Sequence, residues 1–145
     1  HTLGIGACEF PITLEAARKA GDAGLHIFMG APNLVRDRST SGSLKASDVL
    51  RQNLCTGLVS DYYPESLLQA ALMGKKHTGS QASALRQVTA GTGDYLSSPA
   101  RPGRLTPGAD ADIIIVDQSH TWAHITHSLV KGRTVFNTQL HEAVA

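Results

Sequence analysis

The segment that decides the fold is Gly57-Leu-Val-Ser-Asp-Tyr-Tyr-Pro64. A short apolar run there ends in a carboxylate, Asp61, and then in Pro64, a residue favoured at the first position of a helix. This order is typical of a buried parallel strand that leads into a βα turn. Asp61 is therefore expected at the carboxyl end of a strand, where α/β proteins place their catalytic groups. The residues alone leave a second interpretation equally open, in which Asp61 only caps the helix at Pro64.

Strand and helix patterns alternate through the first part of the chain, which predicts parallel βα units and an α/β fold. Thr13 and Ser43 are each placed to cap the helix that follows them, and a long polar loop over 36–43 precedes Ser43. The expected strands are 5–11, 25–29 and 57–61, and the expected helices are 14–20, 44–53 and 64–74.

The character of the chain changes after residue 98. Before that point, Ser80 can cap a helix over 80–88, and 91–98 is expected to be a short helix or turn. Beyond it the pattern predicts short antiparallel strands, with a hairpin turn at Lys131-Gly132. These strands are expected at 103–105, 113–116, 125–130 and 134–136.

Composition narrows the function classes. Lys and Arg number 13 and Asp and Glu number 12, a formal net charge of +1 that gives no reason to expect nucleic acid or an anionic membrane as partner. The apolar runs are too short to cross a bilayer, and no secretory leader is visible at His1, so a cytoplasmic protein is expected. Cys8 and Cys55 lie in unlike contexts, which favours free thiols over a disulfide.

Three βα units do not close a barrel, so the chain is expected to be part of a larger protein.

Five segments together resemble the amidohydrolase superfamily, and within it the members that act in phosphonate metabolism. The segment 101–117 resembles the one by which these enzymes leave their barrel and enter a small β-sandwich, and 129–135 resembles the closing hairpin of that sandwich. The three motifs that narrow the match are Cys8-Glu-Phe-Pro11, Met29-Gly-Ala-Pro-Asn33 and Ser60-Asp-Tyr-Tyr-Pro64. The resemblance implies that residues 1–98 are the last three βα units of a TIM-type (β/α)₈ metallo-hydrolase barrel and that 99–145 are strands and tail of the β-sandwich.

The resemblance also implies a metal-dependent hydrolase with Zn²⁺ or Mn²⁺ as cofactor. Asp61 takes the position of the aspartate that binds metal and accepts the proton of the attacking water. This role is physically sound, because a divalent ion lowers the pKa of bound water and a nearby carboxylate can take its proton. Glu9 stands where many relatives carry a histidine ligand, so it is a candidate metal ligand, an acceptor for a ligand, or a group that binds substrate hydroxyls.

The implied substrate is a small phosphorylated sugar, a ribosyl 1-phosphonate 5-triphosphate from which pyrophosphate is released. Asn33 is a candidate for phosphate or ribose binding, or a residue that only shapes the turn after Pro32. Arg36, Arg38 and Lys45 lie in or beside the polar loop, where cations and hydroxyl groups suit a polyphosphate. A solvated loop with scattered charge is the equally open alternative.

Two other functions stay open: an enzyme of the same superfamily that hydrolyses amide or cyclic amide bonds, and a non-catalytic domain that serves assembly, including a homo-oligomer.

None of the seven histidines is expected to bind the catalytic metal, with His26 at the entry of its strand and His77 in a surface turn. A catalytic metal needs about three protein ligands, and the superfamily takes most of them from earlier strands. The chain alone is therefore expected neither to hold the metal tightly nor to be active.

Overall fold

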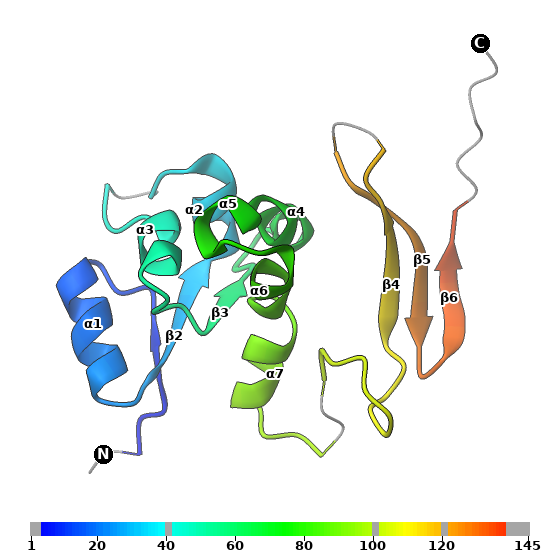
Figure 1. The fold of residues 1–145 in the computed structure, drawn as a ribbon, viewed down its shortest axis with the longest axis horizontal. Helices are drawn as coiled ribbons and strands as arrows, with labels where there is room; N and C mark the ends of the chain where they lie inside the picture. The colour runs from blue at the N-terminus through cyan, green and yellow to red at the C-terminus, as the bar shows by residue number, and fades with distance from the viewer. Residues whose placement is uncertain (1–3, 40–41, 100–101, 120–121, 139–145) are drawn as a thin grey trace.

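The computed structural model describes residues 4–39, 42–99, 102–119 and 122–138 of the 145. Within these ranges the chain forms a mixed α/β structure with one parallel and one antiparallel sheet, each of three strands (Figure 1). The parallel strands are β1 (Ala7–Glu9), β2 (His26–Gly30) and β3 (Gly57–Val59), and the antiparallel ones are β4 (Ile113–Asp117), β5 (His124–Val130) and β6 (Arg133–Asn137). The helices are α1 (Leu14–Asp22), α2 (Ala31–Arg36), α3 (Ala46–Arg51), α4 (Ser66–Met73), α5 (Lys75–Thr78), α6 (Gln81–Arg86) and α7 (Ala90–Tyr95).

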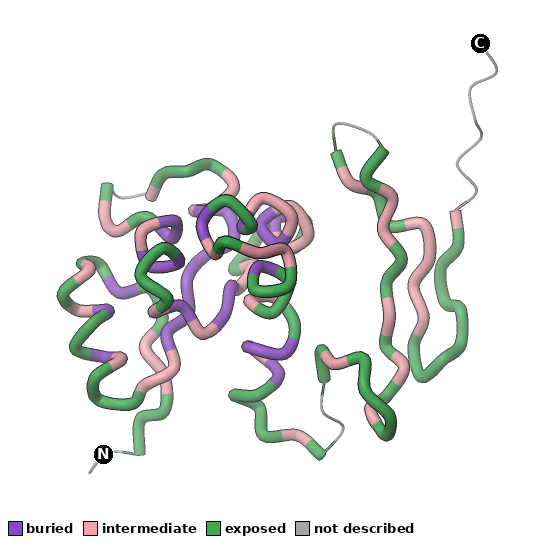
Figure 2. The backbone as a smooth tube through the Cα atoms, in the orientation of Figure 1, coloured by how far each residue is buried: buried purple, intermediate pink, exposed green. Residues whose placement is uncertain are grey.

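The core lies on one face of the parallel sheet. Strand register pairs Cys8 with Ile27 and Met29 with Leu58, so these side chains share that face. They pack with the apolar sides of α1, α2 and α3, and Figure 2 shows the buried residues concentrated in the sheet and in the helices against it. The largest fully buried side chains of this core include Ile27, Leu34, Val49 and Leu50. Burial on this face fixes the register of the three strands.

The opposite face of the parallel sheet is covered near its amino-terminal end by α7. The ring of Tyr95 meets His26 and Phe28 edge to face, at centroid distances of 5.2 and 5.3 Å. Helix α7 approaches β3 so closely that a Cβ on Gly91 would lie 2.2 Å from the carbonyl oxygen of Thr56. A glycine is therefore required at position 91.

Two of the predicted helix caps are confirmed. Thr13 accepts a hydrogen bond from the N–H of Ala16 at 3.1 Å, and Ser80 accepts one from Ser83 at 3.0 Å. Each satisfies an N–H group that the first turn of a helix leaves without a backbone partner.

Other boundaries differ from the prediction. Helix α2 starts directly after β2, where a break was predicted, because Pro32 fits the first turn of a helix as well as it fits a loop. Helix α4 begins at Ser66 rather than at Pro64. The predicted cap Ser43 is wrong, since α3 begins only at Ala46 and its N-cap position is Lys45.

The antiparallel sheet contains the predicted hairpin. Lys131 and Gly132 both have positive φ, 48° and 75°, which is the conformation of a two-residue turn between antiparallel strands. The strand predicted at 103–105 is wrong, because these residues form a turn and irregular backbone. No helix among the described residues is long and apolar enough to cross a membrane.

Candidate functional site

The candidate site lies at the carboxyl edge of the parallel sheet. Because β1, β2 and β3 run in the same direction, their last residues, Glu9, Gly30 and Val59, face the same edge. Asp61 follows β3 after one residue and is exposed. The structure thus places this carboxylate at the edge where α/β proteins bind their ligands.

The interpretation of Asp61 as a helix cap is wrong. Helix α4 begins at Ser66, and its N-cap residue is Glu65, whose side chain makes no capping bond. The hydroxyl of Ser66 instead donates to the carbonyl oxygen of Tyr63 at 2.6 Å. Within the described part of the chain, the Asp61 carboxylate makes no hydrogen bond or ion pair. Its carboxylate oxygens are available to a ligand or to water.

Glu9 does not complete a metal site with Asp61. Glu9 is the exposed last residue of β1 and is level with Phe28 and Gly57, whereas Asp61 lies four residues beyond Gly57. The two carboxylates come from strands that β2 separates. In residues 4–39, 42–99, 102–119 and 122–138, no three His, Cys, Asp or Glu side chains gather closely enough to hold a metal. These residues therefore do not fit a catalytic metal by themselves, which needs about three protein ligands.

Left-handed backbone conformations occur directly after β1 and two residues after β3. Phe10 and Asp61 have φ values of 52° and 53°, whereas Asp37, at 49°, is the C-cap residue of α2. Positive φ is uncommon outside glycine, and it occurs preferentially at ligand-binding and active sites. Asp tolerates this conformation better than most residues, whereas a bulky residue such as Phe10 does not.

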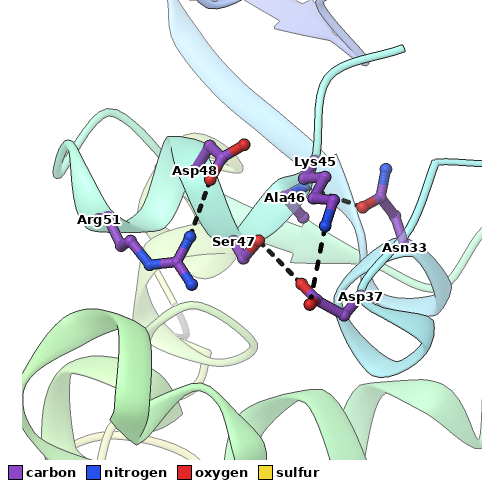
Figure 3. Close-up of polar contacts among 7 residues, drawn as sticks. All are labelled: Asn33, Asp37, Lys45, Ala46, Ser47, Asp48 and Arg51. Atoms are coloured by element: carbon purple, nitrogen blue, oxygen red, sulfur yellow. Dashed lines mark hydrogen bonds and ion pairs between the residues drawn. The ribbon is translucent and has the colours of Figure 1, made fainter. Parts of the chain in front are cut away.

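Asn33 holds the loop between α2 and α3. Its Nδ2 donates to the carbonyl oxygen of Leu44 at 3.1 Å. Its Oδ1 accepts from the N–H of Ala46 at 2.9 Å (Figure 3). The second bond supplies the cap that Ser43 was predicted to give, from a residue thirteen positions earlier. Of the two roles left open for Asn33, the structure shows one that shapes the backbone, and it does so at the loop rather than at the turn after Pro32.

Asp37 anchors the same loop to α3. Its carboxylate accepts a hydrogen bond from the Ser47 hydroxyl at 3.1 Å and lies 3.8 Å from the Lys45 ammonium (Figure 3). The Ser47 bond and the Lys45 charge hold the pKa of Asp37 below its usual value. The Lys45 ammonium therefore already has an anionic partner, the Asp37 carboxylate.

Arg36 and Arg38 flank Asp37 and are exposed. Arg36 ends helix α2, and Arg38 lies in the loop that follows. Among the described residues, neither guanidinium takes part in an ion pair. Within these residues, no carboxylate neutralises either charge.

Comparison with known proteins gives one informative match. Over 139 residues the chain is 36% identical to the α-D-ribose 1-methylphosphonate 5-triphosphate diphosphatase of Escherichia coli (strain K12). The chain is a relative of this diphosphatase. The match covers 94% of the chain and 36% of the diphosphatase, so the chain spans about a third of that protein's length. No family model matches the chain, and no solved structure matches it.

The resemblance to a phosphonate-metabolism enzyme, drawn from five segments, is thereby confirmed. The diphosphatase is a hydrolase by its name. Of the candidate residues, Glu9 ends β1 and Asp61 follows β3 at the carboxyl edge, whereas Arg36, Arg38 and Lys45 lie in or beside the loop between α2 and α3.

One residue near this site was misjudged from the sequence. His77 was predicted in a surface turn, but it lies in α5 and only 8% of its surface is exposed. The polar and basic residues next to it in the sequence suggested a turn. A helix of four residues is too short for a hydrophobic periodicity that would have indicated the burial of His77. His26 lies at the first position of β2, as predicted, while His1 and His120 fall outside the described residues.

The two cysteines are free thiols. Cys55 is buried and donates to the carbonyl oxygen of Gly57 at 3.2 Å. Burial raises the pKa of its thiol to about 12. Cys55 is therefore a packing residue, because a nucleophilic cysteine needs an accessible thiolate.

Proposed function

We propose that this chain is part of a metal-dependent hydrolase that releases pyrophosphate from a ribosyl 1-phosphonate 5-triphosphate and leaves the 5-phosphate. Similarity to the named diphosphatase over 94% of the chain supports the choice of reaction. The exposed carboxylate at the carboxyl edge of the parallel sheet, and the cations in and beside the loop between α2 and α3, support the choice of site.

The proposed architecture is a (β/α)₈ barrel to which residues 1–98 contribute the sixth, seventh and eighth strands. Strands β1, β2 and β3 are parallel and neighbour one another in chain order, as consecutive barrel strands do. Strand β1 pairs only with β2 within the described residues, so its outer edge is open to a further strand. Residues 99–145 would then contribute to a β-sandwich beside the barrel.

In the proposed reaction, Asp61 accepts the proton of the water that attacks the α-phosphorus. The new P–O bond forms as the bond to the bridging oxygen breaks, and the β- and γ-phosphates leave as pyrophosphate. Arg36 and Arg38 would offset negative charge on the phosphates through bidentate hydrogen bonds, with Lys45 as a further cation.

Zn²⁺ or Mn²⁺ is the proposed cofactor, and a bound divalent ion would supply a more acidic water. Glu9 and Asp61 offer fewer ligands than such an ion needs. Further ligands would have to come from outside the described residues.

The observation that carries this proposal is the Asp61 carboxylate, which is exposed at the carboxyl edge, is not used as a cap, and sits on a left-handed backbone. A structural aspartate at this position would be expected to bond the following helix.

The proposal is tested by substrate choice, with the protein encoded by the full reading frame and with Mn²⁺ or Zn²⁺ present. We expect pyrophosphate release from ribosyl or nucleoside 5-triphosphates and no turnover of hydantoins. Turnover of hydantoins without pyrophosphate release would instead support an amide hydrolase. A stable dimer that turns over neither substrate would support an assembly domain.

A further inference from the structure

The imidazole of His77 is buried without a hydrogen-bond partner. Its residue is 8% exposed, and among the described residues neither Nδ1 nor Nε2 has a partner. A neutral imidazole carries one donor and one acceptor, and burying both without partners destabilises the folded state. Native proteins rarely keep such a group without a reason.

Charged groups from three segments act on this imidazole. Burial is the main cause that lowers the pKa of His77, and the charges of Arg51 and Lys76 lower it further, while Asp37 and Asp48 raise it. Of the other helices packed against α5, α4 carries no charged residue, and the only one on α6 is Arg86, which pairs with Asp94.

Both nearby carboxylates are already engaged. Asp48 pairs with Arg51 at 2.8 Å, and Asp37 is held by Ser47 and Lys45. A proton on His77 would therefore create a buried cation that finds a counter-charge only by competing for one of them. Competition for Asp37 would weaken the contacts that hold the loop 37–45 on α3.

Helix α5 can open locally at a small cost in free energy. It is a single turn of four residues, with backbone bonds from His77 and Thr78 to Gly74 and from Gly79 to Lys75. Opening it breaks few hydrogen bonds and exposes one buried imidazole, and such short elements lie at the low end of local stability.

We propose that His77 is a pH-sensitive latch: its protonation releases α5 from α3 and loosens the contacts of Asp37 with Lys45 and Ser47. The release itself is independent of the proposed function, and only the effect on phosphate binding rests on it.

The sign of the effect follows from burial. The unfolded chain takes up the proton near pH 6.5, whereas folded His77 takes it up only at lower pH, so the folded arrangement loses stability as the pH falls below about 6.5. Above that pH the latch is closed.

The test is hydrogen exchange of the full chain between pH 8 and pH 5, compared at each pH with His77→Leu and His77→Gln. In the wild type we expect α5 and residues 37–38 and 43–44 to lose at least tenfold in protection relative to both variants as the pH falls, while α1 stays protected. His26→Gln is the matched control, and it should behave as the wild type does in α5. If one His77 variant does not fold, the other still decides the matter.

The proposal is overturned if α5 keeps its protection at pH 5, or if the two His77 variants lose it as the wild type does. Titration with tripolyphosphate separates this from the proposed function. Failure to bind at pH 8 would count against the phosphate-binding loop, even if the latch opens. Binding that weakens at low pH in the wild type more than in His77→Leu would connect the two.

Discussion

The residue on which this account rests is Asp61. Its exposed carboxylate is combined with a backbone at φ 53°, a conformation that costs most L-amino acids about 1 kcal/mol. If residue 61 served only to end β3, a glycine there would adopt the same backbone conformation without lowering the stability of the fold. Retaining a strained carboxylate at the carboxyl edge is typical of a functional position.

This strain predicts different stabilities for two variants that both lack the carboxylate. Asp61→Gly should be more stable than Asp61→Ala by about 1 kcal/mol, because only glycine adopts positive φ without a Cβ penalty. Urea denaturation of the two purified variants measures the difference. Equal midpoints would show that residue 61 is not held in the left-handed region.

Among the elements, the loop between α2 and α3 is held by a side chain of α2 and by one from the start of the loop itself. Asn33 caps α3 from the first half of α2, and Asp37 reaches Ser47 in α3. These contacts hold against α3 the loop that follows Arg36 and contains Arg38. The shape of the candidate phosphate-binding loop therefore depends on residues that need not touch a substrate.

Asn33 gives a sharp test of this dependence. Asn33→Ala should lower the free energy of unfolding by about 1–3 kcal/mol, because it leaves a buried acceptor and donor without partners. Asn33→Asp keeps an acceptor for the N–H of Ala46 but loses the donor to Leu44. Hydrogen exchange at Ala46 should accordingly rise in Asn33→Ala and stay slow in Asn33→Asp. Slow exchange in both variants would contradict the capping role.

Sequence patterns predicted those elements whose signals are local. The strands around Ile27 and Leu58 follow from continuous apolar runs, and the caps at Thr13 and Ser80 follow from side chains adjacent to their helices. Asn33 as the cap of α3 could not be predicted, because the bond joins residues thirteen positions apart. The burial of His77 depends on the packing of α5 against α3, which no local pattern encodes.

At the scale of the whole molecule, the parallel and antiparallel sheets are joined through the segment that follows α7. Asp94 of α7 pairs with Arg86 of α6 and with Arg104, which lies ahead of β4. A Cβ on Gly93 would lie 2.3 Å from the carbonyl oxygen of Pro102, so this segment rests directly on α7. The two arginines hold the pKa of Asp94 below its usual value, so the bridge is complete at neutral pH and weakens as acid protonates the carboxylate.

The antiparallel sheet exposes apolar side chains on both faces. Ile114 and Phe136 lie on one face and Ile115 on the other, and each is about half exposed. Such surface is normally covered in a folded protein. Together with the open edge of β1, it agrees with the proposal that this chain packs against further parts of a larger hydrolase.

In the proposed hydrolase, Asp61 supplies the catalytic carboxylate. This role is tested by measuring kcat for pyrophosphate release by the full-length protein that carries Asp61→Asn. Asparagine keeps the size and the tolerance of positive φ but cannot accept the proton, so we expect a loss of about 10²–10⁴-fold. Asp22→Asn, which alters an exposed carboxylate at the end of α1, is the matched control and should leave kcat unchanged. A fall of less than threefold in Asp61→Asn, with folding intact, would contradict the claim.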